Sequence, residues 1–140
     1  MFLTPAAQFG AVIMVLTCLL AAWGGRRQGI VAATAFAGWM ISAAIQDRSF
    51  QHPQYATFVL DAVLMIVWVA LAMRWRLGWL TWMAAFQCLT MATHVAAMID
   101  DRIWARASIT AYMIWSYLSL AALAWGGVEG LVDRRRAARA

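Results

Sequence analysis

The chain has 140 residues, of which 65% are hydrophobic and 12% are charged. Its mean hydropathy is +0.72. A soluble domain is roughly half apolar and a quarter charged, so this chain has too few polar residues to cover a soluble fold. Composition therefore excludes an ordinary soluble domain and indicates a membrane protein. The net charge of +5 comes from eleven arginines and no lysine against six acidic residues, and it identifies a partner only after those charges are placed along the chain.

Five apolar segments are long enough to cross a bilayer. A transmembrane helix needs about 20 mostly apolar residues to cross ~30 Å of hydrocarbon. Charged or turn residues bound the five segments, which cover residues 6–23, 28–46, 55–73, 77–99 and 107–125. What remains is too short for a soluble domain. The sequence predicts one all-α domain over residues 1–140, a polytopic transmembrane helix bundle with five spans and a basic tail at 126–140.

The arginines predict how this bundle is oriented. Eight fall on one side of the five spans, namely Arg26, Arg27, Arg74, Arg76, Arg134, Arg135, Arg136 and Arg139, and three fall on the other, namely Arg48, Arg102 and Arg106. Short loops rich in arginine face the cytoplasm, so we expect the N-terminus outside and the C-terminus in the cytoplasm of a bacterial inner membrane. The positive charge then indicates orientation and not a nucleic-acid partner. In the tail, Arg134, Arg135, Arg136 and Arg139 are expected to contact the anionic inner leaflet.

Tryptophans and glycines mark the predicted ends of the spans. Indole rings favour the headgroup region, and the inner boundary is predicted at Trp23, Trp75, Trp79 and Trp125, with Tyr55 and Trp104 at the outer one. The first and last spans both end in Ala-Trp-Gly-Gly, at Gly24 and Gly126. Glycine is a common helix stop, so we expect both helices to end there.

The second span carries small residues at helical spacing. Thr34, Gly38 and Ser42 recur every four residues, with alanines around them. Helices in a membrane associate through close packing of small residues, so we expect this slim helix at the centre of the bundle. The same face is equally suited to binding a helix of another protein.

Two ionisable residues lie within the spans, Asp61 and His94. Both fall ~8–9 Å from the predicted outer boundary at 1.5 Å per residue, and Tyr112 reaches a similar depth. Helical spacing aligns Gln87 and Thr90 with His94, and Ser116 with Tyr112. Two interpretations remain open. These residues bind or relay a proton or a small polar ligand, or they form a hydrogen-bonded network that fixes the packing of three helices.

Metal and pigment sites have weaker support. Residue types suited to zinc or copper occur at His52, His94, Asp100 and Asp101, but their spacing has no helical ligand pattern, so no metal is expected. A single intramembrane histidine, His94, is compatible with haem or chlorophyll against Trp115 or Trp82. No second histidine lies in a span to serve as the second axial ligand of a low-spin haem, so no cofactor is expected. A pigment-binding subunit remains a weaker hypothesis, after the two described next.

The sequence shows no catalytic motif of the G-x-S-x-G, H-E-x-x-H, C-x-x-C or P-loop type, which favours a protein that is not an enzyme. The leading hypothesis is a small integral membrane protein that acts through helix association. It would be an accessory or assembly subunit of a membrane complex or a homo-oligomer, with the bilayer and other membrane subunits as partners. The alternative is a small transporter or channel component that passes protons or a small solute past Asp61, His94 and Tyr112.

Overall fold

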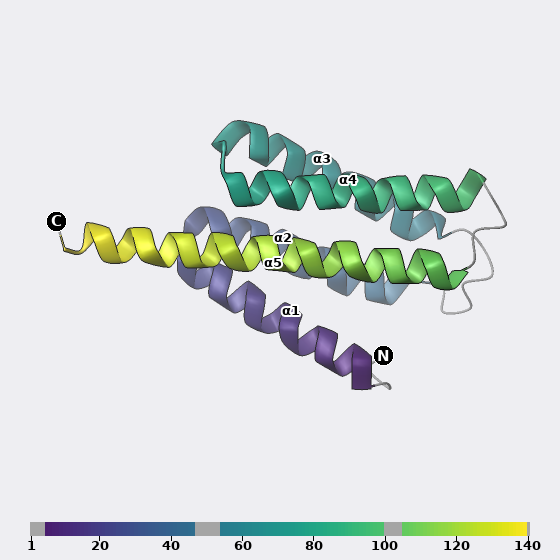
Figure 1. Cartoon of the computed structure of the whole chain (residues 1–140), viewed down its shortest axis with the longest axis horizontal. Coiled ribbons are helices and arrows are strands. Elements are labelled where there is room, and N and C mark those ends of the chain that lie inside the picture. Colours follow the sequence, from purple (N-terminus) through teal and green to yellow (C-terminus); the bar gives the residue numbers. More distant parts are fainter. Residues whose placement is uncertain (1–4, 47–53, 100–104, 140) are drawn as a thin grey trace.

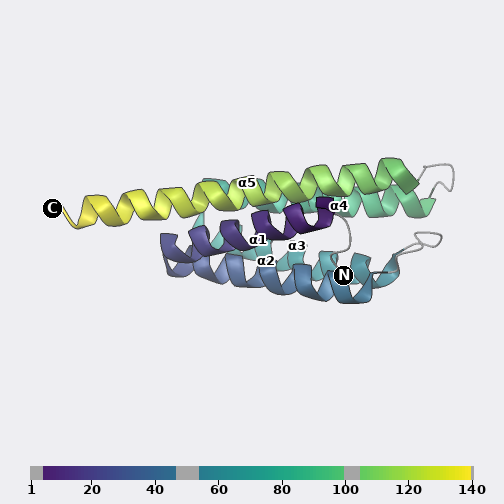
Figure 2. The same cartoon turned by 90° about the horizontal axis from the view of Figure 1, so that it is seen from below.

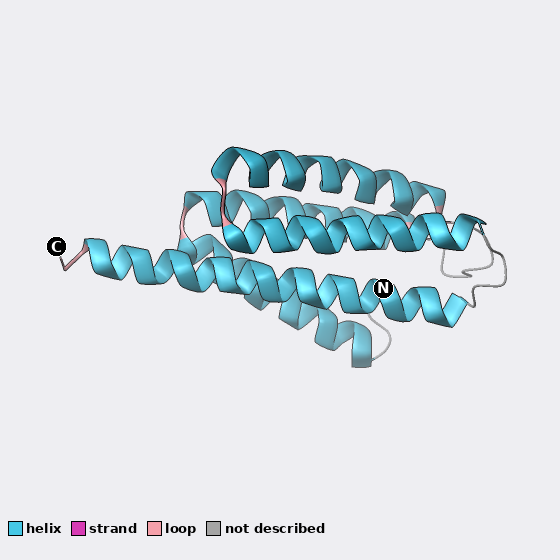
Figure 3. Cartoon of the chain, turned by 45° about the horizontal axis from the view of Figure 1, so that its top comes forward, coloured by secondary structure: helices cyan, strands magenta, loops and turns pink. Residues whose placement is uncertain are grey.

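The computed structural model describes residues 5–46, 54–99 and 105–139, which are almost entirely helical (Figure 3). Within these ranges the chain forms five helices and no strand: α1 (Pro5–Gly24), α2 (Arg26–Ile45), α3 (Tyr55–Trp75), α4 (Gly78–Ile99) and α5 (Ala105–Ala137). The predicted all-α bundle is confirmed. Each apolar segment coincides with one helix to within a few residues at both ends, except at the end of α5.

The apolar composition of the helices suits a membrane. By length and hydropathy, α2, α3, α4 and the 107–137 part of α5 can each cross a bilayer, and α1 contributes a shorter apolar segment, Gln8–Gly24. Large apolar side chains point out of the bundle, among them Leu16 (61% exposed) and Ile66 (64%). Exposing such apolar side chains to lipid tails costs no free energy, because the tails are themselves apolar.

The five helices form a closed ring. Successive helices pack side by side, α5 returns to pack against α1, and α2 also contacts α5 across the ring (Figures 1 and 2). The expectation of a central α2 is confirmed in part, because α2 contacts α1, α3 and α5. Helix α5 also contacts three helices, α1, α2 and α4, and packs more extensively against its neighbours, because its glycines let its backbone approach other helices closely.

The two ends of the bundle differ in their connections. At one end, the turn end, Gly25 alone joins α1 to α2 with a φ of 153°, in the region that favours glycine. Arg76 ends α3 at the same end in a left-handed conformation (φ 52°), and its N–H donates to the carbonyl of Ala72 at 2.8 Å. The guanidinium of Arg27 lies 5.9 Å from the centre of the Trp75 ring, which links the two turns. We call the opposite end, where α2 and α4 finish and α3 and α5 begin, the loop end.

Buried side chains are distributed unevenly between these ends. Among the described residues, the buried apolar side chains lie in the turn half or at the middle of the bundle, and they are Ala21, Val31, Ala32, Ala35, Trp68, Ala72, Trp79, Leu80, Met83, Ala84, Leu120, Ala122 and Leu123. The buried side chains of the loop half are polar, and they are Thr57, Thr90, His94 and Ser108. The apolar core thus closes one half, and polar groups fill the other.

The glycines at the end of the fifth predicted span do not stop the helix. The structure corrects this expectation, because α5 continues through Gly126 and Gly127 to Ala137. The first part of the predicted tail is therefore the last part of one 33-residue helix (Figure 2). A Cβ at Gly127 would lie 3.0 Å from Cα of Ala21, and a Cβ at Gly130 would meet the carbonyl oxygen of Gly24. These glycines are needed for a close crossing of α1 and α5, and tertiary packing overrides their local tendency to end a helix.

Trp79 is also placed differently from the prediction. It was expected at the membrane boundary with the other tryptophans, but its side chain is 0% exposed, whereas Trp23 is 72% and Trp125 is 46% exposed. The Trp79 ring occupies the space left by the missing side chain of Gly126. It therefore packs α4 against α5 and does not contact the headgroup region.

Candidate functional site

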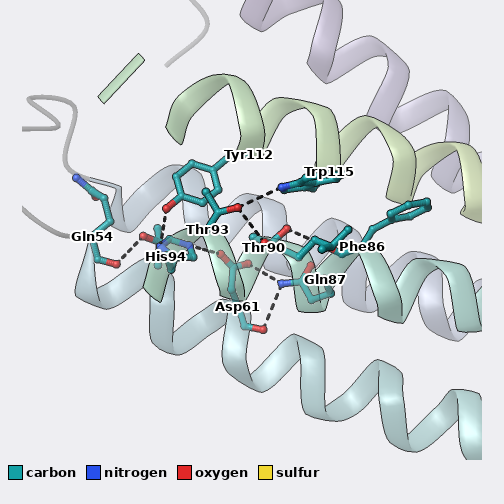
Figure 4. Close-up of polar contacts among 11 residues, drawn as sticks. Gln54, Asp61, Phe86, Gln87, Thr90, Thr93, His94, Tyr112 and Trp115 are labelled. Atoms are coloured by element: carbon teal, nitrogen blue, oxygen red, sulfur yellow. Dashed lines mark hydrogen bonds and ion pairs between the residues drawn. The ribbon is translucent and has the colours of Figure 1, made fainter. Parts of the chain in front are cut away.

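Four polar side chains from three helices meet in the loop half and the middle of the bundle (Figure 4). Asp61 comes from α3, Gln87 and His94 from α4, and Tyr112 from α5. Seven residues separate Gln87 from His94, which is close to two helical turns, so both side chains leave α4 on the same face. We call these four residues the Asp61 network.

Direct hydrogen bonds connect all four members. His94 Nε2 lies 3.0 Å from Asp61 Oδ2, and Tyr112 Oη lies 3.0 Å from His94 Nδ1. Gln87 Nε2 donates to Asp61 Oδ1 at 3.0 Å and to the backbone carbonyl of Asp61 at 3.2 Å. The sequence interpretation placed Asp61, His94 and Tyr112 at one depth, and the structure brings them into contact. The role of Gln87 as a second donor to the carboxylate was not foreseen.

When Asp61 is ionised and His94 is neutral, the arrangement defines a direction for the hydrogen bonds. An ionised carboxylate only accepts, so His94 Nε2–H donates to Asp61. A neutral imidazole has one donor and one acceptor nitrogen, so Nδ1 accepts from the hydroxyl of Tyr112. The network then runs from the Tyr112 hydroxyl through the His94 ring to Asp61, and the Gln87 amide bonds the other carboxylate oxygen.

Burial and aromatic contacts hold His94 in place. Its side chain is 6% exposed, compared with 23% for Asp61. The Phe58 ring meets the imidazole edge-on at 5.9 Å between centroids, and the Tyr112 ring lies at 4.6 Å. His94 is therefore the enclosed member, and Asp61 is the member that keeps some accessible surface.

The other two candidate residues lie outside the network. Thr90 is buried, but its hydroxyl donates to the carbonyl of Phe86 in its own helix at 3.1 Å. Ser116 is exposed, one turn along α5 from Tyr112. Sequence reasoning missed a bond between α4 and α5 beside the network, in which Trp115 Nε1 donates to Thr93 Oγ1 at 3.2 Å (Figure 4).

The small-residue stripe of α2 packs within the chain. Trp68 Nε1 of α3 donates to Thr34 Oγ1 at 3.0 Å. A Cβ at Gly38 would lie 2.5 Å from Cδ1 of Leu64, also on α3. Ser42, the third member, is half-buried. Thr34 and Gly38 thus face α3 and are not open to a partner helix.

Of the candidate residues for a metal or a pigment, some lie within the described part of the structure and some lie outside it. His52, Asp100 and Asp101 lie outside the described residues, and within the described ranges no group of three His, Cys, Asp or Glu side chains could hold a metal ion. Both ring nitrogens of His94 are engaged, so a tetrapyrrole iron or magnesium on His94 would have to displace Asp61 or Tyr112. Trp115 bonds Thr93, and Trp82 stacks on Phe86 with centroids 6.0 Å apart.

The basic residues at the end of α5 make one specific contact. Arg134 Nη1 donates to the backbone carbonyl of Trp23 at 2.8 Å and so bonds a carbonyl in the last turn of α1. Arg135, Arg136 and Arg139 are exposed, and Arg136 lies 3.9 Å from Asp133.

Compared with known proteins, the chain matches no protein-family model, no curated protein and no solved structure.

Proposed function

We propose that the chain is an integral protein of a bacterial inner membrane with five crossings, an outer N-terminus and a cytoplasmic C-terminus. The four apolar helices and the shorter apolar segment of α1 support this count. All arginines with described side chains lie at the turn end, namely Arg26, Arg27, Arg74, Arg76, Arg134, Arg135, Arg136 and Arg139. Arginine-rich connections face the cytoplasm, so the turn end is inside and the loop end outside.

Single cysteines test this orientation. In a background without Cys18 and Cys88, Tyr55→Cys at the loop end is expected to react with a membrane-impermeant maleimide in intact cells, because Tyr55 is 65% exposed. Ala138→Cys, beyond the end of α5, is expected to react only after the membrane is opened. The reverse labelling pattern would contradict the orientation, and labelling of both positions in intact cells would contradict an odd number of crossings.

For the function, we propose that the outer half of the bundle passes protons or a small polar solute and that the Asp61 network handles the ligand. The observation that carries the proposal is the unbroken series of hydrogen bonds through Tyr112, His94 and Asp61. Ionisable side chains at membrane depth are costly and are found mostly at ion and proton sites. Their location adds support, because the buried side chains of this half are polar while the apolar core fills the other half.

The competing proposal is an accessory or assembly subunit that acts by helix association. It depends on a helix face that accepts a partner, and the stripe on α2 was its main support. Thr34 and Gly38 pack against α3 within the chain. Because that face is occupied, the Asp61 network is the better supported basis for function.

Transport assays in proteoliposomes test the proposal. Vesicles containing the wild-type chain are expected to dissipate an imposed proton gradient, or to take up a small polar solute, faster than protein-free vesicles. Asp61→Asn is expected to reduce the rate to the protein-free background, because the charged acceptor of the network is lost. Thr93→Val is the matched control, since it removes an α4–α5 hydrogen bond beside the network without removing an ionisable group. Equal rates for wild-type and Asp61→Asn vesicles would remove the proposal.

A further inference from the structure

We infer that the ligand of the Asp61 network is the proton, and that each chain stores one proton on His94 and receives it through the Tyr112 hydroxyl. This inference rests on the proposed function and narrows its ligand from a proton or small solute to one species. Three features support it: the donors around the carboxylate, the charge of the network, and the accessibility of its members.

The donors around Asp61 make it a poor site for other cations. Oδ1 accepts from the Gln87 amide, and Oδ2 accepts from the His94 ring. The amide nitrogen of Gln87 lies against two acceptor oxygens, the carboxylate and the backbone carbonyl, which fixes its orientation with the nitrogen toward Asp61. A sodium or potassium ion needs several oxygen ligands, but here N–H groups point at the carboxylate and would repel a metal ion. A proton needs no such shell of ligands.

The charge of the network favours uptake of one positive charge. With Asp61 ionised and His94 neutral, the four residues carry −1. The titratable side chains in contact are Asp61 on α3, His94 on α4 and Tyr112 on α5. Cys18 of α1 contacts Met14 and Ala32 instead, and α2 contributes no titratable group except its arginines at the turn end. One bound proton would therefore bring the charge of these four residues to zero.

The hydrogen-bond pattern gives a balanced route for that proton. A hydronium ion donates a proton to Tyr112 Oη and becomes water, as the proton already on Oη moves to His94 Nδ1. Tyr112 ends neutral, and His94 becomes an imidazolium ion that donates to Tyr112 through Nδ1 and to Asp61 through Nε2. The network charge changes from −1 to 0 and no other bond is made or broken. The reverse transfer releases the proton.

Accessibility agrees with entry at Tyr112. His94 is 6% exposed, so water does not reach its ring freely. Tyr112 is half-buried. Phe58 covers the edge of the imidazole, and Nε2 already carries a hydrogen toward Asp61, so the added proton must reach Nδ1, whose hydrogen-bond partner is Tyr112.

The nitrogen NMR signals of His94 test the inference directly. The chain has two histidines, so the His52→Gln variant labelled with ¹⁵N-histidine reports on His94 alone. In lipid nanodiscs we expect a neutral ring with its hydrogen on Nε2 at high pH, and a ring protonated on both nitrogens at low pH, with one proton taken up per chain. Replacing sodium chloride with potassium or tetramethylammonium chloride at constant ionic strength should leave the titration unchanged.

Variants separate this inference from the proposed function. Asp61→Asn should shift the Nε2 signal of the neutral ring, because it replaces the charged acceptor of the Nε2–H group with an amide. Tyr112→Phe should slow proton exchange at Nδ1, and Thr93→Val should change neither property. The titration itself uses only the His52→Gln variant, which keeps all four members of the network. A ring that never gains a second proton, or a titration that depends on the identity of the cation, would overturn the inference. If either result were found while Asp61-dependent passage of a solute persisted, the proposed function would stand without proton storage on His94. If Asp61-dependent passage were absent as well, the proposed function would also be overturned.

Discussion

Replacing Gly130 with alanine is expected to lower the free energy of unfolding by about 3 kcal/mol, the upper part of the usual range for overpacking. The added Cβ would meet the backbone carbonyl oxygen of Gly24 and lie 2.8 Å from Nε2 of Gln28. A backbone carbonyl cannot rotate away as a side chain can, so α1 and α5 must separate. Unfolding in mixed micelles with increasing sodium dodecyl sulfate measures the change.

Two other glycines provide controls for this variant. A Cβ at Gly78 would meet nothing within 4 Å, so Gly78→Ala should change stability by less than about 0.5 kcal/mol. A Cβ at Gly38 would meet the flexible end of Leu64, which can move, so Gly38→Ala should cost less than Gly130→Ala. If all three variants were equally stable, the close crossing of α1 and α5 would not be a determinant of the fold.

Removing His94 alone is expected to destabilise the bundle more than removing His94 and Asp61 together. Among the described side chains, His94→Leu leaves Gln87 as the one remaining donor to the Asp61 carboxylate. Leaving a buried group without its hydrogen-bond partner costs about 1–3 kcal/mol, and more for a charged group, and we expect about 3 kcal/mol at neutral pH because the carboxylate is charged but keeps some exposed surface. The same unfolding measurement applies.

The double variant Asp61→Leu/His94→Leu should recover more than half of that loss. It removes the uncompensated carboxylate, and Gln87 keeps the backbone carbonyl of position 61 as an acceptor. Tyr112 loses its partner in both variants, so this loss cancels in the comparison. A double variant less stable than His94→Leu would show that the Asp61 carboxylate does not destabilise the bundle when His94 is absent, which would contradict this prediction.

The sequence was sufficient for the parts of the structure that depend on local composition and depth. Apolar runs of transmembrane length predicted the helices, since the hydrocarbon thickness sets their length. Asp61, His94 and Tyr112 could be expected near one another because each lies a similar number of residues from the same predicted boundary. The partner of each nitrogen and oxygen could not be predicted, because it depends on how α3, α4 and α5 are rotated about their axes.

The errors arose where a contact between distant segments overrides a local rule. Gly126 and Gly127 follow a tryptophan, as at a helix end, but α1 and Trp79 occupy the space beside them and α5 continues. Trp79 resembles a boundary residue by position alone and is buried because Gly126 leaves room for its ring. Pair contacts of this kind are not encoded in the periodicity of a single segment.

The continuity of α5 gives the molecule a mechanical property. From Tyr112 to Arg136 the helix is unbroken over 24 residues, about 36 Å at 1.5 Å per residue. The C-terminal part of this helix packs against α1 through its glycines and through the hydrogen bond from Arg134 to Trp23. A tilt of about 5° pivoting at Tyr112 displaces Arg136 by about 3 Å over that length. A rearrangement of the Tyr112 hydrogen bond in the loop half of the bundle is thereby geometrically coupled to the position of charged residues at the turn end.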